Sequence, residues 1–129
     1  MKTSVKVLSF VLFALLSLNI QAQTIKLPSP EFSTDLMSAL KPGNDLGFSS
    51  DKKGALEKEN KSFVNDIVSI AGSSDDDETK KSKILNRKKE RDGVLGSVLD
   101  DSALKSYKKE INKQIRPLKS KYKLAKLVF

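Results

Sequence analysis

Apolar residues recur at helical spacing through most of the chain, and no stretch of useful length alternates apolar and polar residues as a half-buried strand would. From residue 34 onward, three groups of helix-breaking or capping residues separate the helical stretches. These groups are Pro42-Gly43, Gly72-Ser73-Ser74 and Asp100-Asp101-Ser102. The pattern therefore predicts an all-α fold in which residues 34–129 form a single helical domain. We expect three to five helices, arranged as a small bundle or as an extended helical hairpin.

The first two helices are bounded by residues that cap and stop helices. A short helix over residues 35–41 follows Thr34, whose hydroxyl can accept an N-terminal amide hydrogen, and it stops before Pro42. A longer helix over residues 51–71 follows the serine pair Ser49-Ser50, either of which can act as its N-cap. This helix presents one apolar face, formed by Leu56, Phe63, Val64, Ile67 and Ile70.

A third helix is predicted to begin near Asp76, because acidic residues in a first helical turn interact favourably with the helix dipole. Its middle, residues 86–92, is almost wholly charged, so we expect it to face solvent or an interface. Gly93 and Gly96 leave the continuity of this helix open. This helix is predicted to end near Asp100, and the group Asp100-Asp101-Ser102 is expected to supply the N-cap of a final helical region.

This final region carries a continuous apolar stripe surrounded by basic residues. Its members step by 3 or 4 residues, with Lys108 as an alternative to the tyrosine: Leu104, Tyr107, Ile111, Ile115, Leu118, Tyr122, Ala125 and Phe129. Pro117 lacks an N–H group and disfavours helix at the preceding residue, so we expect the last helix to be kinked or broken there. Nine basic residues lie from position 105 onward, against Glu110 alone.

Residues 1–22 have the charged, apolar, small-residue order of a secretory signal peptide. Two lysines precede an apolar run over residues 7–18, which is shorter than the roughly 20 residues that span a bilayer. Cleavage after Ala22 would remove both lysines and lower the net charge from +8 to +6. We therefore expect an exported protein of the bacterial envelope, periplasmic or secreted, without a transmembrane segment after signal removal. An uncleaved anchor helix is the alternative.

The segment that follows the signal, residues 23–33, contains Pro28 and Pro30 and shows no periodicity, so it is predicted to be an extended, mobile leader. The chain has no Cys, so disulfides cannot stabilise the small domain. Its apolar content comes mainly from aliphatic residues, and no Trp is present. A chain of this kind is expected to be only modestly stable, and a homodimer would help it.

The residue types present argue against catalysis. The absence of His and Cys removes the usual general base near neutral pH, the thiol nucleophile and the commonest metal ligand. The acidic run over residues 75–78 lacks the alternating spacing and central glycine of a calcium-binding EF-hand loop, so it is interpreted as a solvated helix start. We therefore expect a protein that is not an enzyme, with no catalytic residue, no cofactor and no metal site.

Two stretches resemble each other. In one, Leu46-Gly47-Phe48-Ser49-Ser50-Asp51-Lys52 leads into residues 56–63. In the other, Arg91-Asp92-Gly93-Val94-Leu95-Gly96-Ser97-Val98-Leu99-Asp100-Asp101-Ser102 leads into residues 104–109. The arrangement resembles the Spy-like periplasmic proteins, which carry paired Leu-Thr-x-x-Gln motifs. Phe48, Ser49 and Lys52 stand at the Leu, Thr and Gln places of the first motif, while Leu99, Asp100 and Ala103 stand there in the second. The resemblance implies a thin, curved, usually dimeric helical hairpin whose concave, basic and apolar face binds unfolded proteins or senses envelope stress.

Three interpretations of the C-terminal region remain open. The first interpretation is a core-packing helix with a solvated basic face. The second is an amphipathic element that binds anionic lipids or polyanions, and the third is the client-binding surface of a holdase-type chaperone. For the whole protein, the resemblance favours an exported, non-enzymatic helical binding protein, a Spy-like holdase or stress-related protein. The alternatives are a basic amphipathic binder of anionic lipid or polyanion surfaces and a structural subunit of unknown role. Nucleic acid is not expected as a partner because the chain is predicted to be exported. The candidate binding surface comprises Leu104, Tyr107, Lys108, Ile111, Ile115, Arg116, Leu118, Lys119, Tyr122, Lys123 and Phe129.

Overall fold

The computed structural model describes residues 24–129, so the predicted signal peptide lies outside the described residues. Five α-helices and one short 3₁₀ helix make up this part of the chain, and no strand occurs in it. The elements are α2 (Glu31–Leu40), η1 (Asn44–Leu46), α3 (Ser50–Ala71), α4 (Asp77–Val98), α5 (Asp101–Lys121) and α6 (Lys123–Val128). The predicted all-α class is confirmed, and the helices form a compact bundle. No helix within residues 24–129 combines the length and apolar character needed to cross a bilayer.

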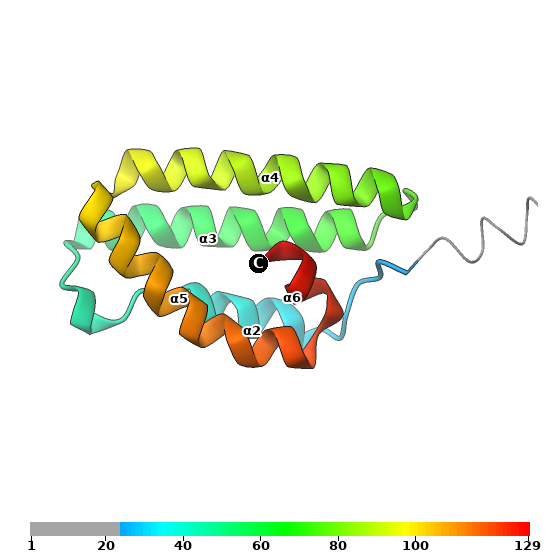
Figure 1. The fold of residues 1–129 in the computed structure, drawn as a ribbon, viewed down its shortest axis with the longest axis horizontal. Coiled ribbons are helices and arrows are strands. Elements are labelled where there is room, and N and C mark those ends of the chain that lie inside the picture. Colours follow the sequence, from blue (N-terminus) through cyan, green and yellow to red (C-terminus); the bar gives the residue numbers. More distant parts are fainter. Residues whose placement is uncertain (1–23) are drawn as a thin grey trace, which may run out of the picture.

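Helices α3 and α4 form a long hairpin, lying side by side along their lengths (Figure 1). Helix α2 contacts both α3 and α5, while α6 contacts α4 and α5, so these three helices cover one side of the hairpin. Each of the five α-helices of the described residues contributes fully or nearly fully buried side chains to one apolar core. Among them are Phe32 and Leu36 from α2, Phe63 and Ile67 from α3, Ile84 and Leu95 from α4, Tyr107 and Ile115 from α5, and Leu124 and Val128 from α6.

Three of the helices begin where the capping residues predict. The side chain of Ser49 accepts a hydrogen bond from the Lys52 amide at 3.3 Å, at the start of α3. At the start of α4, the carboxylate of Asp76 accepts a hydrogen bond from the Thr79 amide at 2.8 Å. At the start of α5, the carboxylate of Asp100 accepts one from the Ala103 amide at 2.7 Å. Each carboxylate also lies at the positive end of its helix dipole. These helix starts are confirmed.

Helix α2 begins earlier than predicted. It starts at Glu31 rather than Asp35, and Pro30 occupies its N-cap with a φ of −56°, so the expected cap Thr34 lies inside the helix. Proline is compatible with a helix start because the first amide has no intrahelical partner and its φ is already fixed near the helical value. Burial of Phe32 adds a reason to extend the helix in this direction. The predicted leader over residues 23–33 is therefore too long at its C-terminal end.

The non-helical segment that remains, residues 24–30, is anchored to α4. The carboxylate of Asp77 accepts hydrogen bonds from the Thr24 hydroxyl, at 2.6 Å, and from the backbone amides of Thr24 and Ile25. The side chain of Ile25 is buried in the core. These hydrogen bonds lower the pKa of Asp77 from 3.8 to about 2.

Glycine and proline interrupt the long helices less than the sequence indicates. Helix α4 runs unbroken past Gly93 and Gly96, both of which are exposed with open space around them. Helix α5 continues through Pro117 to Lys121, so of the kink or break predicted there the break does not occur, and the kink stays a prediction. Pro117 is exposed, and its missing N–H leaves unpaired only a backbone carbonyl on the solvated side of the helix. The interruption comes instead at Tyr122, which has extended backbone angles.

Candidate functional site

The apolar half of the candidate binding surface faces the interior of the bundle. Tyr107 is completely buried, and Ile111, Ile115 and Tyr122 are less than a tenth exposed. The remaining apolar members, Leu104, Leu118 and Phe129, are partly buried and pack against the same core. The apolar stripe is therefore used to hold α5 and α6 to the other helices, as the core-packing interpretation expects.

The basic half of the candidate surface lies on the outside. Lys108, Arg116 and Lys123 are exposed, and Lys119 is half-buried. With 100° of rotation per residue, the cations of α5 point away from the buried stripe. Four exposed cations at positions i, i+4, i+8 and i+11 share this outer face, and we call them the cationic row: Lys105, Lys109, Lys113 and Arg116. Within residues 24–129, no carboxylate lies within 4 Å of a cationic-row nitrogen.

Other cations of the final helices are paired. Lys121 lies 2.9 Å from Asp35 and 3.6 Å from Glu31, which links the end of α5 to α2. The Tyr122 hydroxyl also donates to Asp35, at 2.7 Å. The hydrogen bonds from Tyr122 and Lys121 lower the pKa of Asp35, and the bond to Asp35 raises that of Lys121. These contacts hold α2 against α5 at the surface.

Three cations of α4 point inward, which the sequence interpretation missed. Lys80, Arg87 and Arg91 are each less than a tenth exposed. They recur with Ile84 and Leu95 at steps of four, three, four and four residues, which is the spacing of one helical face. A search for that spacing that included basic residues would have found this face. The expectation that residues 86–92 face solvent or an interface is wrong at Arg87 and Arg91, which are buried within the bundle of this chain.

The two inward arginines differ in how their charge is compensated. Arg87 lies 2.8 Å from Glu59 and 2.7 Å from Asp66, both on α3. Burial acts to lower the pKa of Arg87, but the contacts with the two carboxylates outweigh it and raise the pKa. Arg91 is 5% exposed, and neither terminal nitrogen of its guanidinium has a hydrogen-bond partner among the residues that the structure describes. Burial lowers its pKa.

Two backbone carbonyls accept hydrogen bonds from the buried ammonium group of Lys80. Its ammonium donates to the carbonyl of Ile25 at 2.8 Å and to that of Ala71 at 2.9 Å. The first bond ties the residue 24–30 segment to α4, and the second satisfies a carbonyl at the end of α3, which has no intrahelical partner. This buried lysine is therefore a structural clamp.

A buried polar junction joins α2, α3 and α5. The carbonyl oxygen of Leu40, at the end of α2, accepts hydrogen bonds from the Asn60 side-chain amide at 3.0 Å and from the Tyr107 hydroxyl at 2.6 Å. The same hydroxyl lies 3.3 Å from the side-chain oxygen of Asn60. Burial raises the pKa of Tyr107, so its hydroxyl remains a donor.

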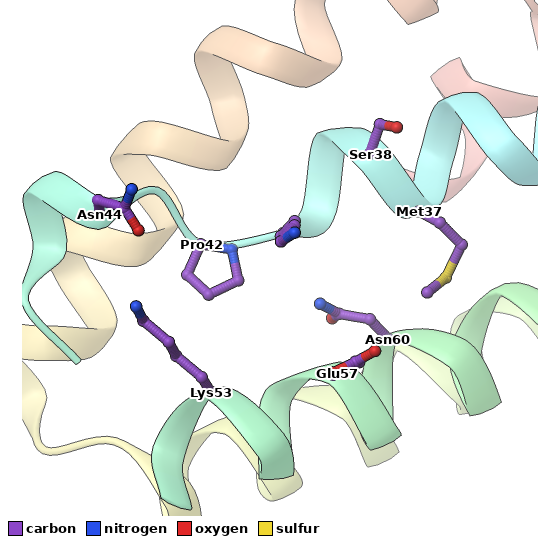
Figure 2. A pocket seen from close by; sticks show the side chains of 8 residues that line it. Met37, Ser38, Pro42, Asn44, Lys53, Glu57 and Asn60 are labelled. Carbon is purple, nitrogen blue, oxygen red and sulfur yellow. The ribbon is translucent and has the colours of Figure 1, made fainter. Parts of the chain in front are cut away.

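Above this junction lies an open hollow of about 400 Å³ between α2 and α3 (Figure 2). Met37 extends into it from α2, Lys53, Glu57 and Asn60 extend from α3, and Pro42 closes one side. The Asn60 amide already bonds to Leu40, which leaves a lysine and a carboxylate as the polar groups facing the hollow from α3. In the part of the chain that the structure describes, no group of three or more His, Cys, Asp or Glu side chains could hold a metal ion.

The comparisons with known proteins give no match: no family model, no curated protein and no solved structure is similar to this chain. The resemblance to the Spy-like proteins therefore stays a prediction from the residues that carry it. At the places of the motif threonines, Ser49 and Asp100 act as helix N-caps. The resemblance also implies an exposed apolar face on an open hairpin, whereas the apolar stripe of this chain lies inside the bundle.

Proposed function

We propose that this protein is an exported, non-enzymatic helical binding protein that attaches to anionic surfaces of the bacterial envelope through the cationic row of α5. The observation that supports the proposal is the separation of the two sides of this helix. Its apolar side chains are used within the core, while four cations without a nearby carboxylate lie outside. A surface of this kind attracts multiply charged anions and does not need an apolar partner.

The strength expected from such a surface is modest. Each Lys or Arg near an anionic membrane contributes about 1 kcal/mol, so the four cations of the row would contribute about 4 kcal/mol. This corresponds to a dissociation constant of about 1 mM. The neighbouring Lys108 and Lys119 would add to it. Binding is therefore expected to be reversible and to weaken with salt, since the screening length at 0.1 M is about 10 Å.

A holdase function is the less favoured proposal because the folded bundle offers a client little apolar surface. Within residues 24–129, the large apolar side chains that are clearly exposed are Leu27, Leu85 and Val94. The last two lie on α4, nine residues apart, so they point in opposite directions around the helix and do not form one patch. Single exposed apolar residues are ordinary on protein surfaces. Client binding through the α5–α6 stripe would require α5 and α6 to detach.

Sedimentation with lipid vesicles tests the proposed surface. The protein is mixed with phosphatidylglycerol or phosphatidylcholine vesicles at low and high salt, and only the anionic vesicles at low salt should carry it down. Replacing the cationic row (K105Q, K109Q, K113Q, R116Q) should abolish sedimentation. A control with equal loss of charge replaces four exposed lysines on α3 and α4 (K58Q, K61Q, K81Q, K89Q) and should retain most of it. Equal sedimentation of the two variants would refute the proposal.

Two further arms separate the alternatives. Heparin and phosphatidylglycerol are offered in competition, since a soluble polyanion and a lipid headgroup present the same negative charge in different forms. A light-scattering assay with a reduced, aggregating client measures holdase activity directly. Suppression of aggregation at stoichiometric amounts, together with no vesicle binding, would replace the proposed function with the chaperone one.

Export is the other half of the proposal and rests on residues 1–22. The full chain is expressed in a bacterium, the cells are fractionated, and the mass of the recovered protein is measured. We expect an envelope or culture-medium fraction whose chain begins at Gln23. Recovery of the uncleaved chain from the membrane fraction would favour an anchor instead.

A further inference from the structure

A second open hollow, also of about 400 Å³, lies between the residue 24–30 segment and the junction of α5 with α6, and we call it the α6 groove. Figure 1 shows this segment and the junction at the same end of the bundle. Its volume lies within the roughly 300–1,000 Å³ of small-molecule sites, which are mostly apolar with a few polar groups. The aliphatic part of its lining consists of Ile25, Leu27, Pro28, Leu124 and Leu127.

Both walls of the α6 groove are fixed by contacts within the protein. On one side, the backbone of Ile25 donates to Asp77 at 3.0 Å and accepts from Lys80 at 2.8 Å. On the other side, Tyr122 and Leu124 are each less than a tenth exposed and belong to the core. A ligand therefore does not have to order these walls, which would otherwise reduce its affinity.

The α6 groove leaves apolar surface open to solvent. Leu27 is 48% exposed, although the segment that carries it is tied to α4. Leu127 is only partly buried, and it lines the same groove. Leu27 thus belongs to an apolar surface shared by two segments, and such surfaces are typical of ligand-binding grooves.

The charge along the α6 groove is positive. Lys26 and Lys123 line it and are exposed, and no carboxylate within residues 24–129 lies within 4 Å of either ammonium group. Lys121 also lines it, but Asp35 compensates its charge at 2.9 Å. No Asp or Glu of the described residues lines this groove, whereas Glu57 lines the hollow between α2 and α3. An anionic head is therefore the charge that complements it.

The neutral polar side chains of the α6 groove are already used. The Thr24 hydroxyl donates to Asp77 at 2.6 Å, and the Tyr122 hydroxyl donates to Asp35 at 2.7 Å. A peptide or a sugar would bury polar groups against these walls without side-chain partners, which is costly. An alkyl chain has no such groups, so the lining favours a hydrocarbon body.

We propose that the α6 groove binds a medium-chain fatty acid, whose alkyl chain lies between Leu27 and Leu127 and whose carboxylate lies near Lys26 and Lys123. Exposed ion pairs contribute little, so most of the affinity is expected from burial of the chain, and the lysines select the charge of the head. The proposal does not depend on the cationic row, because none of the residues that line the groove belongs to it.

Four probes separate the contributions of the chain and the head. Octanoate, octanol and octylammonium have the same chain length with a negative, a neutral and a positive head, and acetate has the head without the chain. Each is titrated into the ¹⁵N-labelled protein, and the amides of residues 24–27 and 121–127 are followed. We expect octanoate to saturate with a dissociation constant tighter than about 1 mM, octanol to bind about fivefold more weakly, octylammonium more weakly still, and acetate not to saturate.

One pair of variants tests the apolar wall. Leu27→Ser should weaken the binding of octanoate and octanol to the same extent, by at least about threefold, because it removes apolar surface that both chains cover. Leu85→Ser is the matched control, since Leu85 is 53% exposed but lies on α4, outside the groove. Because both leucines are about half exposed, neither change is expected to prevent folding.

A second pair of variants tests the head. K26Q with K123Q should weaken octanoate binding about fivefold and leave octanol binding unchanged, which a merely structural effect would not do. K81Q with K89Q removes the same charge from exposed positions of α4 and should leave both unchanged. The cationic-row variant should bind octanoate as wild type does even if it no longer sediments with vesicles, so the two proposals fail separately.

Three results would overturn the inference: octanoate that does not saturate below about 10 mM, octanol that binds as tightly as octanoate, or Leu27→Ser that binds both as Leu85→Ser does. Shifts of the same amides that appear with rising protein concentration alone would assign the groove to a second copy of this chain instead. The comparison of the three heads needs no variant, so it decides the matter whatever the variants do.

Discussion

Replacing Tyr107 with Phe removes one oxygen atom from the buried polar junction that joins α2, α3 and α5. The hydroxyl donates to the Leu40 carbonyl at 2.6 Å and lies 3.3 Å from the Asn60 side-chain oxygen. After the change, the Leu40 carbonyl still accepts the Asn60 amide, but the Asn60 oxygen loses the hydroxyl as a neighbour. The ring itself is retained, so the packing of α5 against α2 and α3 changes little.

The expected cost follows from burial. Asn60 is 2% exposed and Tyr107 is completely buried, so water cannot replace the lost donor. Leaving a buried polar atom unsatisfied costs about 1–3 kcal/mol. For a domain of this size, each kcal/mol changes the melting temperature by about 4–8 °C. We therefore expect Tyr107→Phe to melt on the order of 5–20 °C below wild type.

Thermal and urea unfolding, followed by far-UV circular dichroism, measure the effect. Tyr122→Phe is the matched control, because it removes the same atom from a hydroxyl that donates to Asp35, which is about a third exposed and also bound by Lys121. Solvent can take over that hydrogen bond, so the control should lose less stability. If Tyr107→Phe were as stable as wild type, or Tyr122→Phe the less stable of the two, the buried junction would not have the role assigned to it.

Four other changes probe the charged interior and the helix ends. Arg91→Met should stabilise the protein by about 1–2 kcal/mol in urea unfolding, because it removes a buried charge that has no ion-pair partner within 4 Å among residues 24–129; a destabilised variant would contradict this. Arg87→Met should instead cost about 3 kcal/mol in the same assay, since Glu59 would remain buried without its counter-ion. The Asp77 pKa is lowered from 3.8 to about 2, so its contribution to stability is complete above pH 4 and is lost as the pH falls toward 2. Amide exchange of the segment before α2 should accelerate over that range, and Asp77→Ala should accelerate it at neutral pH. Pro117→Ala should raise stability by about 1–3 kcal/mol in urea unfolding by restoring a helical N–H donor, and a variant no more stable than wild type would contradict this.

The sequence predicts the helices of this fold well where side chains act locally. Ser49, Asp76 and Asp100 act as caps at short range, and they place the starts of α3, α4 and α5. The start of α2 was misplaced because its cause is not local. Phe32 is held in the core by α5–α6 residues such as Tyr122, whose ring centroid is 5.2 Å away. A pattern read along the chain does not include such a contact.

The candidate site was predicted less well, for a different reason. The spacing of the C-terminal stripe correctly indicates one apolar side and one basic side, but periodicity does not state what covers the apolar side. Here Tyr107 and Ile115 are covered by the bundle itself. Arg91 was missed because basic residues are assigned to solvent by default, and only the packing of α3 and α5 around it shows that its guanidinium is enclosed. The sequence pattern alone therefore does not reveal which basic side chains are buried.

The Leu40 carbonyl has a consequence for the order in which the chain folds. Its two donors lie 20 and 67 residues further along the sequence, whereas α3 and α4 are neighbours joined by a short connection. Closing a short loop costs less conformational entropy than closing a long one, so we expect the α3–α4 hairpin to form first. Helix α2 is then expected to pack stably only after α5 has docked. In the native protein, α2 and α5 should unfold together as one cooperative unit of hydrogen exchange, while the α3–α4 hairpin remains protected.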